Sequence, residues 1–239
     1  MQAARELEVS TDSVVSVREV ARTYRQGPIE VHALRGVDLE VERGEFLALT
    51  GPSGSGKTTL LNLIGALDRP TRGKIVLDGI DLGTLSRTAL SRLRRDRIGF
   101  VFQAYNLIPV LTAYENAEMV VRLQDMPTPE RRKRVMALLG EVGLGGMEHR
   151  RPDELSGGQQ QRVAIARAIA SNPAVALADE PTANVDSKTA AMLLDIMEKL
   201  NRERGATFIF STHDPRVMER ARRIVRLVDG RIESDERKG

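Results

Sequence analysis

A glycine-rich segment at positions 51–58 has the composition and spacing of a phosphate-binding loop. It consists of Gly51, Pro52, Ser53, Gly54, Ser55, Gly56, Lys57 and Thr58, with Thr59 directly after it. Glycines let backbone N–H groups approach phosphate oxygens closely, and the helix that follows adds the positive end of its dipole. We expect Lys57 to reach the terminal phosphates and the Thr58 hydroxyl to bind Mg²⁺. Apolar segments on both sides favour this interpretation over a turn that binds nothing.

Two carboxylates, Asp179 and Glu180, directly follow the apolar segment 175–178. Ligands of parallel sheets gather at the carboxyl ends of the strands. We therefore expect Asp179 to face the Mg²⁺ shell and Glu180 to face an attacking water, since a general base must lie within one hydrogen bond of that water. Without a phosphate-binding loop nearby, the same pair would instead indicate solvated carboxylates at the end of a strand.

The segment LSGGQ at 155–159 opens a predicted helix and offers a second phosphate-type site. Its candidates are Ser156, Gly157, Gly158 and Gln159. Free amides at a helix N-terminus attract phosphate. The alternative is an ordinary serine N-cap beside a glycine hinge, which capping chemistry alone favours.

The elements that must position these residues alternate along the chain. Apolar and polar residues alternate between Val14 and about Val41, which predicts an antiparallel β layer. Further strands are predicted at 46–50, 74–78, 98–103, 174–178, 206–212, 224–228 and 231–233, and helices from about 57 and at 86–97, 159–171, 187–203 and 215–221. The stretch 104–158 is predicted to be mainly helical. This order predicts an α/β protein with a mostly parallel sheet, an antiparallel β subdomain and an inserted α-helical subdomain at about 104–158.

The predicted domain covers residues 13–232, between a flexible leader at 1–12 and a charged tail at 233–239.

The composition excludes several classes of site. There is no cysteine for a disulfide or a Cys-ligated zinc site, and the three histidines form no HExxH motif. A formal charge of +3 and 3% aromatic residues do not indicate nucleic-acid binding. No apolar run is long enough to span a bilayer, so we expect any membrane role to need a separate membrane partner.

Together these motifs resemble the ATP-binding-cassette (ABC) ATPases over about residues 13–232. Three further segments match: Gln103 after the strand IGFVF (the Q-loop), 182–186 (the D-loop) and 211–214 (the H-loop). The resemblance implies a P-loop NTPase fold with a RecA-like core. It also implies a head-to-tail dimer with two ATP molecules between the protomers.

The resemblance also implies roles for individual residues. Ser156 and Gly158 would contact the γ-phosphate of the partner's nucleotide. Their neighbours Gly157 and Gln159 belong to the same nucleotide-binding set. His213 would hold the γ-phosphate and the water, and Gln103 would join the Mg²⁺ or water shell. Tyr24 would stack on adenine, although an aromatic at a strand end can simply pack. Asp186 belongs to the nucleotide-binding set, and Val185 before it departs from the family's usual leucine.

The sequences of three longer stretches, 65–75, 93–119 and 151–189, are similar to those of MacB/LolD-type ATPases, which work with membrane permeases. In that branch the segment after Gln103 docks a coupling helix of the permease. The apolar residues 107–111 could form such a surface or could pack the helical subdomain. The sequence leaves both open.

We therefore expect a Mg²⁺-dependent ATPase subunit that powers a separate integral membrane permease. It would act as a homodimer or with a paired ABC subunit, peripherally on the cytoplasmic face of the inner or plasma membrane, with no nucleic-acid partner. One alternative is a soluble ABC mechanoenzyme acting on DNA or ribosomes, but such relatives carry two cassettes, long coiled coils or zinc-binding cysteines. Another is a non-catalytic nucleotide sensor, against which Lys57, Asp179, Glu180 and His213 argue.

Overall fold

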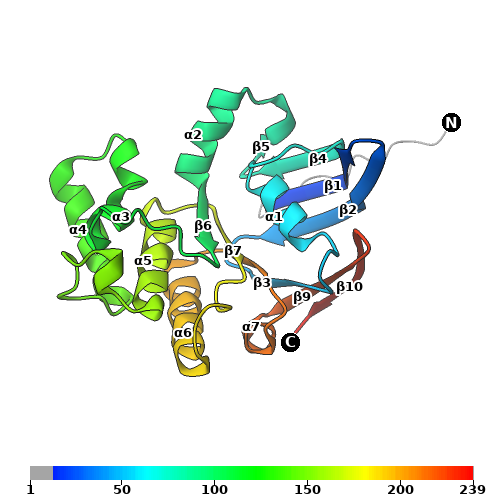
Figure 1. The fold of residues 1–239 in the computed structure, drawn as a ribbon. Coiled ribbons are helices and arrows are strands. Elements are labelled where there is room, and N and C mark those ends of the chain that lie inside the picture. The colour runs from blue at the N-terminus through cyan, green and yellow to red at the C-terminus, as the bar shows by residue number, and fades with distance from the viewer. Residues whose placement is uncertain (1–12, 239) are drawn as a thin grey trace.

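A computed structural model describes residues 13–238, apart from the side chain of Gln26. The chain forms two β-sheets and a set of helices (Figure 1). The leader expected at 1–12 lies outside the described residues. None of the helices in residues 13–238 is long and apolar enough to cross a membrane.

A four-stranded antiparallel sheet is formed mainly by the N-terminal part of the chain. Its strands lie in the order β2-β1-β4-β5, namely β2 (Ile29–Glu42), β1 (Ser13–Gln26), β4 (Arg72–Leu77) and β5 (Ile80–Asp81). Val15 pairs with Val41 on one side and Leu77 on the other. Buried Leu39 and Val41 alternate with exposed glutamates in β2, because successive side chains of a strand point to opposite faces.

A six-stranded sheet forms the centre of the molecule. Its order is β10-β9-β3-β8-β7-β6, namely β10 (Arg231–Arg237), β9 (Arg223–Val228), β3 (Phe46–Thr50), β8 (Phe208–Ser211), β7 (Val175–Asp179) and β6 (Ile98–Phe102). Every neighbouring pair is parallel except β10 and β9. The carboxyl ends of β3, β6, β7 and β8 therefore meet at one edge, as the mostly parallel sheet predicted from the sequence requires.

Both faces of this sheet are buried. In β3, Leu47 and Leu49 pack into a core shared with the antiparallel sheet, whereas Phe46 and Ala48 pack into a core shared with the helical region. The ring of Phe46 lies 4.6 Å from that of Phe210, centroid to centroid. A sheet covered on both faces explains why its strands are apolar at nearly every position.

The helices follow the strands in the order the sequence predicts. They are α1 (Lys57–Ile64), α2 (Arg87–Arg97), α3 (Ala113–Glu118), α4 (Thr128–Glu141), α5 (Gly157–Ala170), α6 (Ser187–Arg204) and α7 (Pro215–Arg220), with short 3₁₀ turns η1 (Leu82–Thr84), η2 (Val121–Leu123) and η3 (Pro152–Glu154). Asp186 caps α6 by accepting from the backbone N–H groups of Lys188 and Thr189, and Gly205 ends the helix at φ 65°.

Between β6 and α5 the chain forms only helices, turns and loops, and Figure 1 shows this part to one side of the central sheet. Val135, Leu138 and Leu139 of α4 are buried on one helix face, as their spacing predicts. Within the segment 107–111, Leu107 packs against the same core but Val110 is 72% exposed. Leu107 thus follows the packing interpretation, and for Val110 the docking interpretation stays a prediction.

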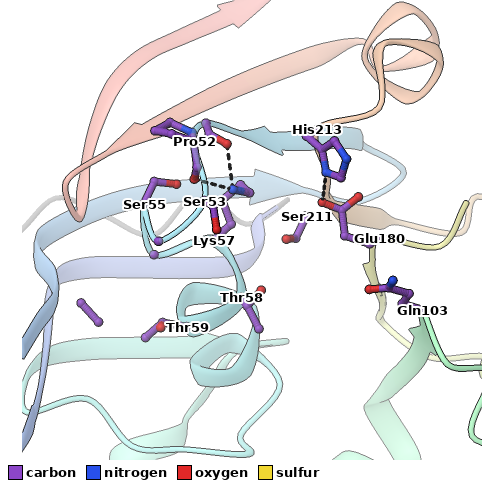
Figure 2. A pocket seen from close by; sticks show the side chains of 14 residues that line it. Pro52, Ser53, Ser55, Lys57, Thr58, Thr59, Gln103, Glu180, Ser211 and His213 are labelled. Atoms are coloured by element: carbon purple, nitrogen blue, oxygen red, sulfur yellow. Dashed lines mark hydrogen bonds and ion pairs between the residues drawn. The ribbon is translucent and has the colours of Figure 1, made fainter. Parts of the chain in front are cut away.

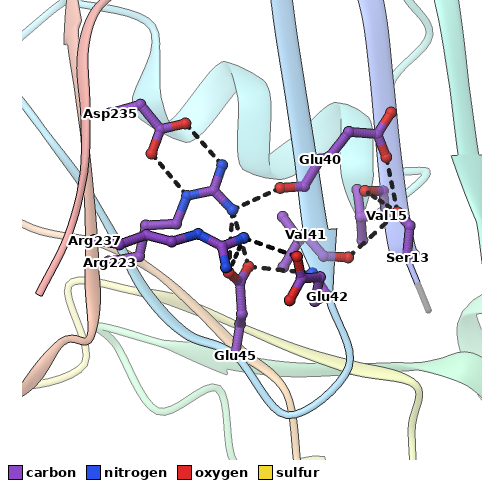
Figure 3. A network of polar contacts seen from close by, with 9 residues as sticks. All are labelled: Ser13, Val15, Glu40, Val41, Glu42, Glu45, Arg223, Asp235 and Arg237. Carbon is purple, nitrogen blue, oxygen red and sulfur yellow. Dashed lines mark hydrogen bonds and ion pairs between the residues drawn. The ribbon is translucent and has the colours of Figure 1, made fainter. Parts of the chain in front are cut away.

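The C-terminal strand is longer than the sequence indicated. We expected a strand at 231–233 followed by a charged tail, but β10 continues to Arg237 and pairs with β9 to that end, with one register shift between Ile232 and Ser234. Arg223 explains the extension: its guanidinium donates to both carboxylate oxygens of Asp235 at 2.7 Å and to Glu45 at 3.1 Å (Figure 3). Arg237 forms a further ion pair with Glu42 at 2.9 Å. Asp235 and Arg237, charged residues that were expected to belong to an unpaired tail, therefore form the ion pairs that fix the end of β10.

Candidate active site

A cavity of about 640 Å³ lies where the parallel strands end. It is lined by the glycine-rich loop between β3 and α1 and by residues that follow three other strands. Figure 2 shows Lys57 and Thr58 on one side and Glu180, His213 and Gln103 on the other. Segments far apart in the sequence therefore converge on one volume large enough for a small-molecule ligand.

The loop needs glycine at two of its positions for steric reasons. Gly51 has φ 134°, and a Cβ there would lie 2.0 Å from the carbonyl oxygen of Leu227. Gly56 has φ 104°, and a Cβ there would lie 2.6 Å from the carbonyl oxygen of Ala33. Residues with side chains rarely adopt these backbone angles. The loop is therefore held tightly against β9 and β2.

Two polar groups of the loop suit a phosphate ligand. The ammonium group of Lys57 donates to the carbonyl oxygens of Gly51 and Pro52, at 2.8 and 2.9 Å. The hydroxyl of Ser55 is buried and has no hydrogen-bond partner among the described residues. A buried hydroxyl without a partner is costly unless a ligand supplies one. The Lys57 ammonium complements the negative charge of a triphosphate, and the Ser55 hydroxyl can donate to one of its oxygens.

The residues expected to bind Mg²⁺ lie together. The Thr58 hydroxyl donates to a carboxylate oxygen of Asp179 at 3.3 Å, and Gln103 lines the same cavity. These are oxygen donors, which Mg²⁺ prefers, and Mg²⁺ sites often use only one or two protein carboxylates. Within residues 13–238 no group of three His, Cys, Asp or Glu side chains could hold a metal alone. This donor set fits an ion completed by phosphate oxygens and water.

Glu180 is held in a strained and well-defined position. Its backbone has φ 45°, in the left-handed region, and its N–H donates to the carbonyl oxygen of Ser211 at 2.9 Å. Such strain persists only where the surrounding structure imposes it. Its carboxylate accepts from the Thr212 hydroxyl at 3.1 Å and contacts Nδ1 of His213 at 2.6 Å. Because a carboxylate can only accept, Nδ1 of His213 carries the proton and Nε2 stays free for a ligand.

Several predicted site residues lie outside the cavity of this single chain. The LSGGQ residues, Asp186 and Tyr24 do not line it, and Asp179 adjoins it only through its contact with the Thr58 hydroxyl. Ser156 caps α5 through a capping box with Gln159, which is the alternative the sequence left open. Asp186 caps α6, and its hydrogen bonds to Thr189 hold the pKa of its carboxyl below the usual range.

Tyr24 is held by contacts with Asp68, which follows α1, and with Arg22. Its hydroxyl donates to Asp68 at 2.9 Å, and the guanidinium of Arg22 lies 4.4 Å from its ring centre. Arg22 also pairs with Asp68 at 2.9 Å. The ring is thus fixed at its hydroxyl and covered on one face.

Sequence reasoning did not assign roles to Ala33, Ser211 or Thr212. Ala33 and Ser211 line the cavity, and Thr212 is fully buried beneath Glu180. The position of Ser211 and Thr212 at the carboxyl end of β8, which runs parallel to β7, could have indicated them. No sequence signal marks Ala33, because its contribution is a backbone carbonyl near Gly56.

Comparison with known proteins agrees with this geometry. A profile of the family described as "ABC transporter" matches residues 34–183. The chain belongs to the ABC transporter family. Its central sheet, phosphate loop and LSGGQ helix are those of an ABC ATP-binding domain, as expected from the sequence.

Three relatives illustrate the branch. The lipoprotein-releasing system ATP-binding protein LolD 1 of Rhodopseudomonas palustris is 49% identical, covering 92% of this chain and 98% of that protein. The macrolide export ATP-binding/permease protein MacB of Syntrophobacter fumaroxidans is 48% identical over 93% of this chain but only 31% of its own length. The ATP-binding cassette MJ0796 of Methanocaldococcus jannaschii, solved as a dimer with ADP and Pi, is similar in structure with a TM-score of 0.86 and 46% identity, over 94% of this chain and 99% of that one.

The ABC ATP-binding domain is thus established as LolD/MacB-like. The MacB comparison shows that such a domain can be fused to a permease, whereas the LolD relative has about the length of this chain. By their names, these relatives are transporter components and cassettes. They give no support to the DNA or ribosome alternative.

Proposed function

We propose that this ABC protein hydrolyses ATP and thereby drives a separate membrane permease. The observation that carries the proposal is the cavity in which the phosphate loop faces the Glu180–His213 pair. Lys57 and the loop amides would bind the β- and γ-phosphates. Glu180 would accept a proton from the water that attacks the γ-phosphate, and the unprotonated Nε2 of His213 would accept a hydrogen bond from that water and orient it. Donation from Nε2 to the γ-phosphate would require a doubly protonated imidazole.

Mg²⁺ would be held by the Thr58 hydroxyl, with Asp179 and Gln103 in its shell. When bound, it would neutralise charge on the phosphates. The oxygen donors described above support this assignment. Tyr24 would stack on adenine with the ring face that Arg22 does not cover.

We infer that two chains pair head to tail, with the LSGGQ segment of one completing the cavity of the other. In one chain Ser156 is exposed and the start of α5 does not line the cavity. A two-fold arrangement would bring it to the partner's nucleotide. The dimeric structure of the similar cassette MJ0796 supports this arrangement. The partner would be a second copy or a paired ABC subunit.

The permease would dock at an apolar groove beside the helical region. The groove has a volume of about 350 Å³ and includes Phe100, Met119 and Leu123. Leu67 and Leu123 on its rim are 50% and 64% exposed, which is unusual for large apolar side chains. Such docking would place the protein peripherally on the cytoplasmic face of the membrane. The names of its relatives favour lipoprotein release or macrolide-type export as the work performed.

A capture experiment tests the transport assignment. A tagged Glu180→Gln chain is incubated with detergent-solubilised host membranes and Mg²⁺-ATP, and captured proteins are identified by mass spectrometry. Stoichiometric recovery of an integral membrane protein is expected, and a Leu123→Asp change in the same chain should reduce it. Recovery of ribosomal or DNA-repair proteins without a membrane protein would contradict the proposal.

A further inference from the structure

Gln103 and Asn184 hold each other through two hydrogen bonds. The side-chain N–H₂ of Gln103 donates to Oδ1 of Asn184 at 3.2 Å. In return, the side-chain N–H₂ of Asn184 donates to the backbone oxygen of Gln103 at 3.0 Å. The two residues are 81 positions apart and belong to the segments that follow β6 and β7. The pair therefore connects two strand ends on the same side of the cavity.

Tyr105 fastens this pair to the start of α5. Its hydroxyl donates to the backbone oxygen of Asn184 at 3.2 Å. Its own carbonyl oxygen accepts from buried Arg167 of α5 at 2.8 Å, and its backbone has φ 56°. A Cβ on Gly157 would lie 2.8 Å from the Tyr105 hydroxyl oxygen, so the ring fits closely against the LSGGQ segment. The position of Asn184 is thus tied to a helix, which restricts its movement.

This arrangement has a consequence for the carboxamide of Gln103. Its N–H₂ group is engaged by Asn184, so its oxygen remains for the cavity, and Figure 2 shows that oxygen on the side facing Thr58. Only the oxygen of a carboxamide can accept from water or bind a cation. A flipped amide would present hydrogen atoms to the same place. The orientation therefore decides whether Gln103 can serve the metal and water shell.

We propose that Asn184 is a positioning residue for ATP hydrolysis, which fixes the carboxamide of Gln103 with its oxygen toward the nucleotide cavity. Tyr105 anchors Asn184 and thereby links this orientation to the start of α5. The inference rests on the proposed function. It adds a role for Asn184 within the segment 182–186, in which only Asp186 had been assigned one.

The test begins with Asn184→Ala, which removes both side-chain hydrogen bonds. We expect kcat for phosphate release to fall about tenfold, with KM for ATP changed less than about twofold, because the bound transition state loses an oriented group while ground-state binding remains. Ser187→Ala, an exposed neighbour without a side-chain hydrogen bond in the described residues, is the matched control. Both variants should melt within a few degrees of the parent, since the lost bonds are exposed.

Two further readouts separate positioning from a general structural role. In a Gln103→Ala background, Asn184→Ala should not lower kcat any further, because Asn184 acts through the carboxamide that is already missing. Mn²⁺ titrated into the ATP-bound Glu180→Gln chain and followed by electron paramagnetic resonance should bind about fivefold more weakly when Asn184 is also alanine. Additive losses in the cycle, or unchanged kcat and Mn²⁺ affinity, would overturn the inference. A parent chain that releases no phosphate would instead refute the proposed function itself, while the Mn²⁺ titration would still report on Gln103.

Discussion

Nδ1 of His213 lies 2.6 Å from Oε1 of Glu180, although 77% of the histidine side chain is exposed and only 19% of the glutamate is. A largely buried carboxylate is therefore oriented by an imidazole that stands at the solvent side of the cavity. The hydroxyl of buried Thr212 donates to the second carboxylate oxygen, Oε2, at 3.1 Å. Both oxygens are thus fixed before any ligand binds.

This contact predicts the effect of replacing the histidine. In His213→Ala, Glu180 keeps only the Thr212 bond, and the free Nε2 is lost. We expect kcat for ATP hydrolysis to fall at least about 100-fold, the range of a positioned acid–base group, while KM for ATP changes less than about threefold. Steady-state phosphate release measures both values. Retention of the parent kcat would remove His213 from the mechanism.

The head-to-tail dimer predicts that two inactive chains can complement each other. Lys57→Ala disables the phosphate loop and Ser156→Arg disables the start of α5, and each variant alone should lose nearly all phosphate release. In a mixed dimer, the intact loop of one chain meets the intact LSGGQ segment of the other, so one complete site forms. Mixing the two variants should restore measurable activity. If the mixture stays as inactive as its components, the two motifs act within one chain.

The fixed ring of Tyr24 predicts a contribution specific to the base of the nucleotide. Base stacking on an aromatic ring contributes about 1–3 kcal/mol, so Tyr24→Ala should weaken ATP binding by roughly fivefold to 150-fold. Binding of inorganic tripolyphosphate, which lacks a base, should be unchanged. Tyr24→Phe keeps the ring and loses only the bond to Asp68, and serves as the comparison. Calorimetric titration gives these affinities, and equal losses for both ligands would contradict stacking.

The ion pair between Arg223 and Asp235 predicts a pH-dependent contribution to stability. The hydrogen bonds from Arg223 hold the pKa of the Asp235 carboxyl below its ordinary value of 3.8. A carboxyl whose pKa is lower in the folded state than in the unfolded state stabilises the fold at pH values above its unfolded-state pKa. This contribution is lost as the pH falls through the folded-state pKa. Asp235 is 38% exposed, so water screens the pair and we expect Asp235→Asn to cost only about 1 kcal/mol at pH 7.

Urea unfolding between pH 7 and pH 3 measures this effect. The difference in unfolding free energy between the parent and Asp235→Asn should shrink below about pH 4, as the carboxyl becomes protonated. Asp153→Asn, at an exposed carboxyl without a hydrogen bond or ion pair in the described residues, should show no such trend. A difference that is constant over the whole range would mean that Asp235 does not act through its charge.

The parts of the molecule that depend on local sequence patterns could be predicted from the sequence alone. The apolar strands and the glycine-rich loop predicted which strand ends meet, and Lys57, Thr58, Glu180, Gln103 and His213 do lie around one cavity. Parallel strands impose this convergence, so the residues after them needed no long-range information.

What the sequence could not show depends on pairs of side chains far apart in the chain. The end of β10 is held by Arg223 and by Arg237, which reaches Glu42 across 195 positions. The bond from Tyr24 to Asp68 and the pairing of Gln103 with Asn184 are likewise contacts between separate segments. These residue types are common in loops and strands, so no sequence pattern marks the side chains that pair. The pairs become visible only in the folded structure.

The most direct test of the account compares phosphate release by the parent chain and by Glu180→Gln with Mg²⁺-ATP. Glutamine keeps the shape of the side chain but cannot accept the proton of the attacking water, so we predict a loss of at least about 100-fold in kcat with ATP still bound. Size-exclusion chromatography with light scattering should show the variant as a dimer when ATP is present. Hydrolysis by Glu180→Gln at the parent rate would contradict the role of Glu180 on which the proposed function depends.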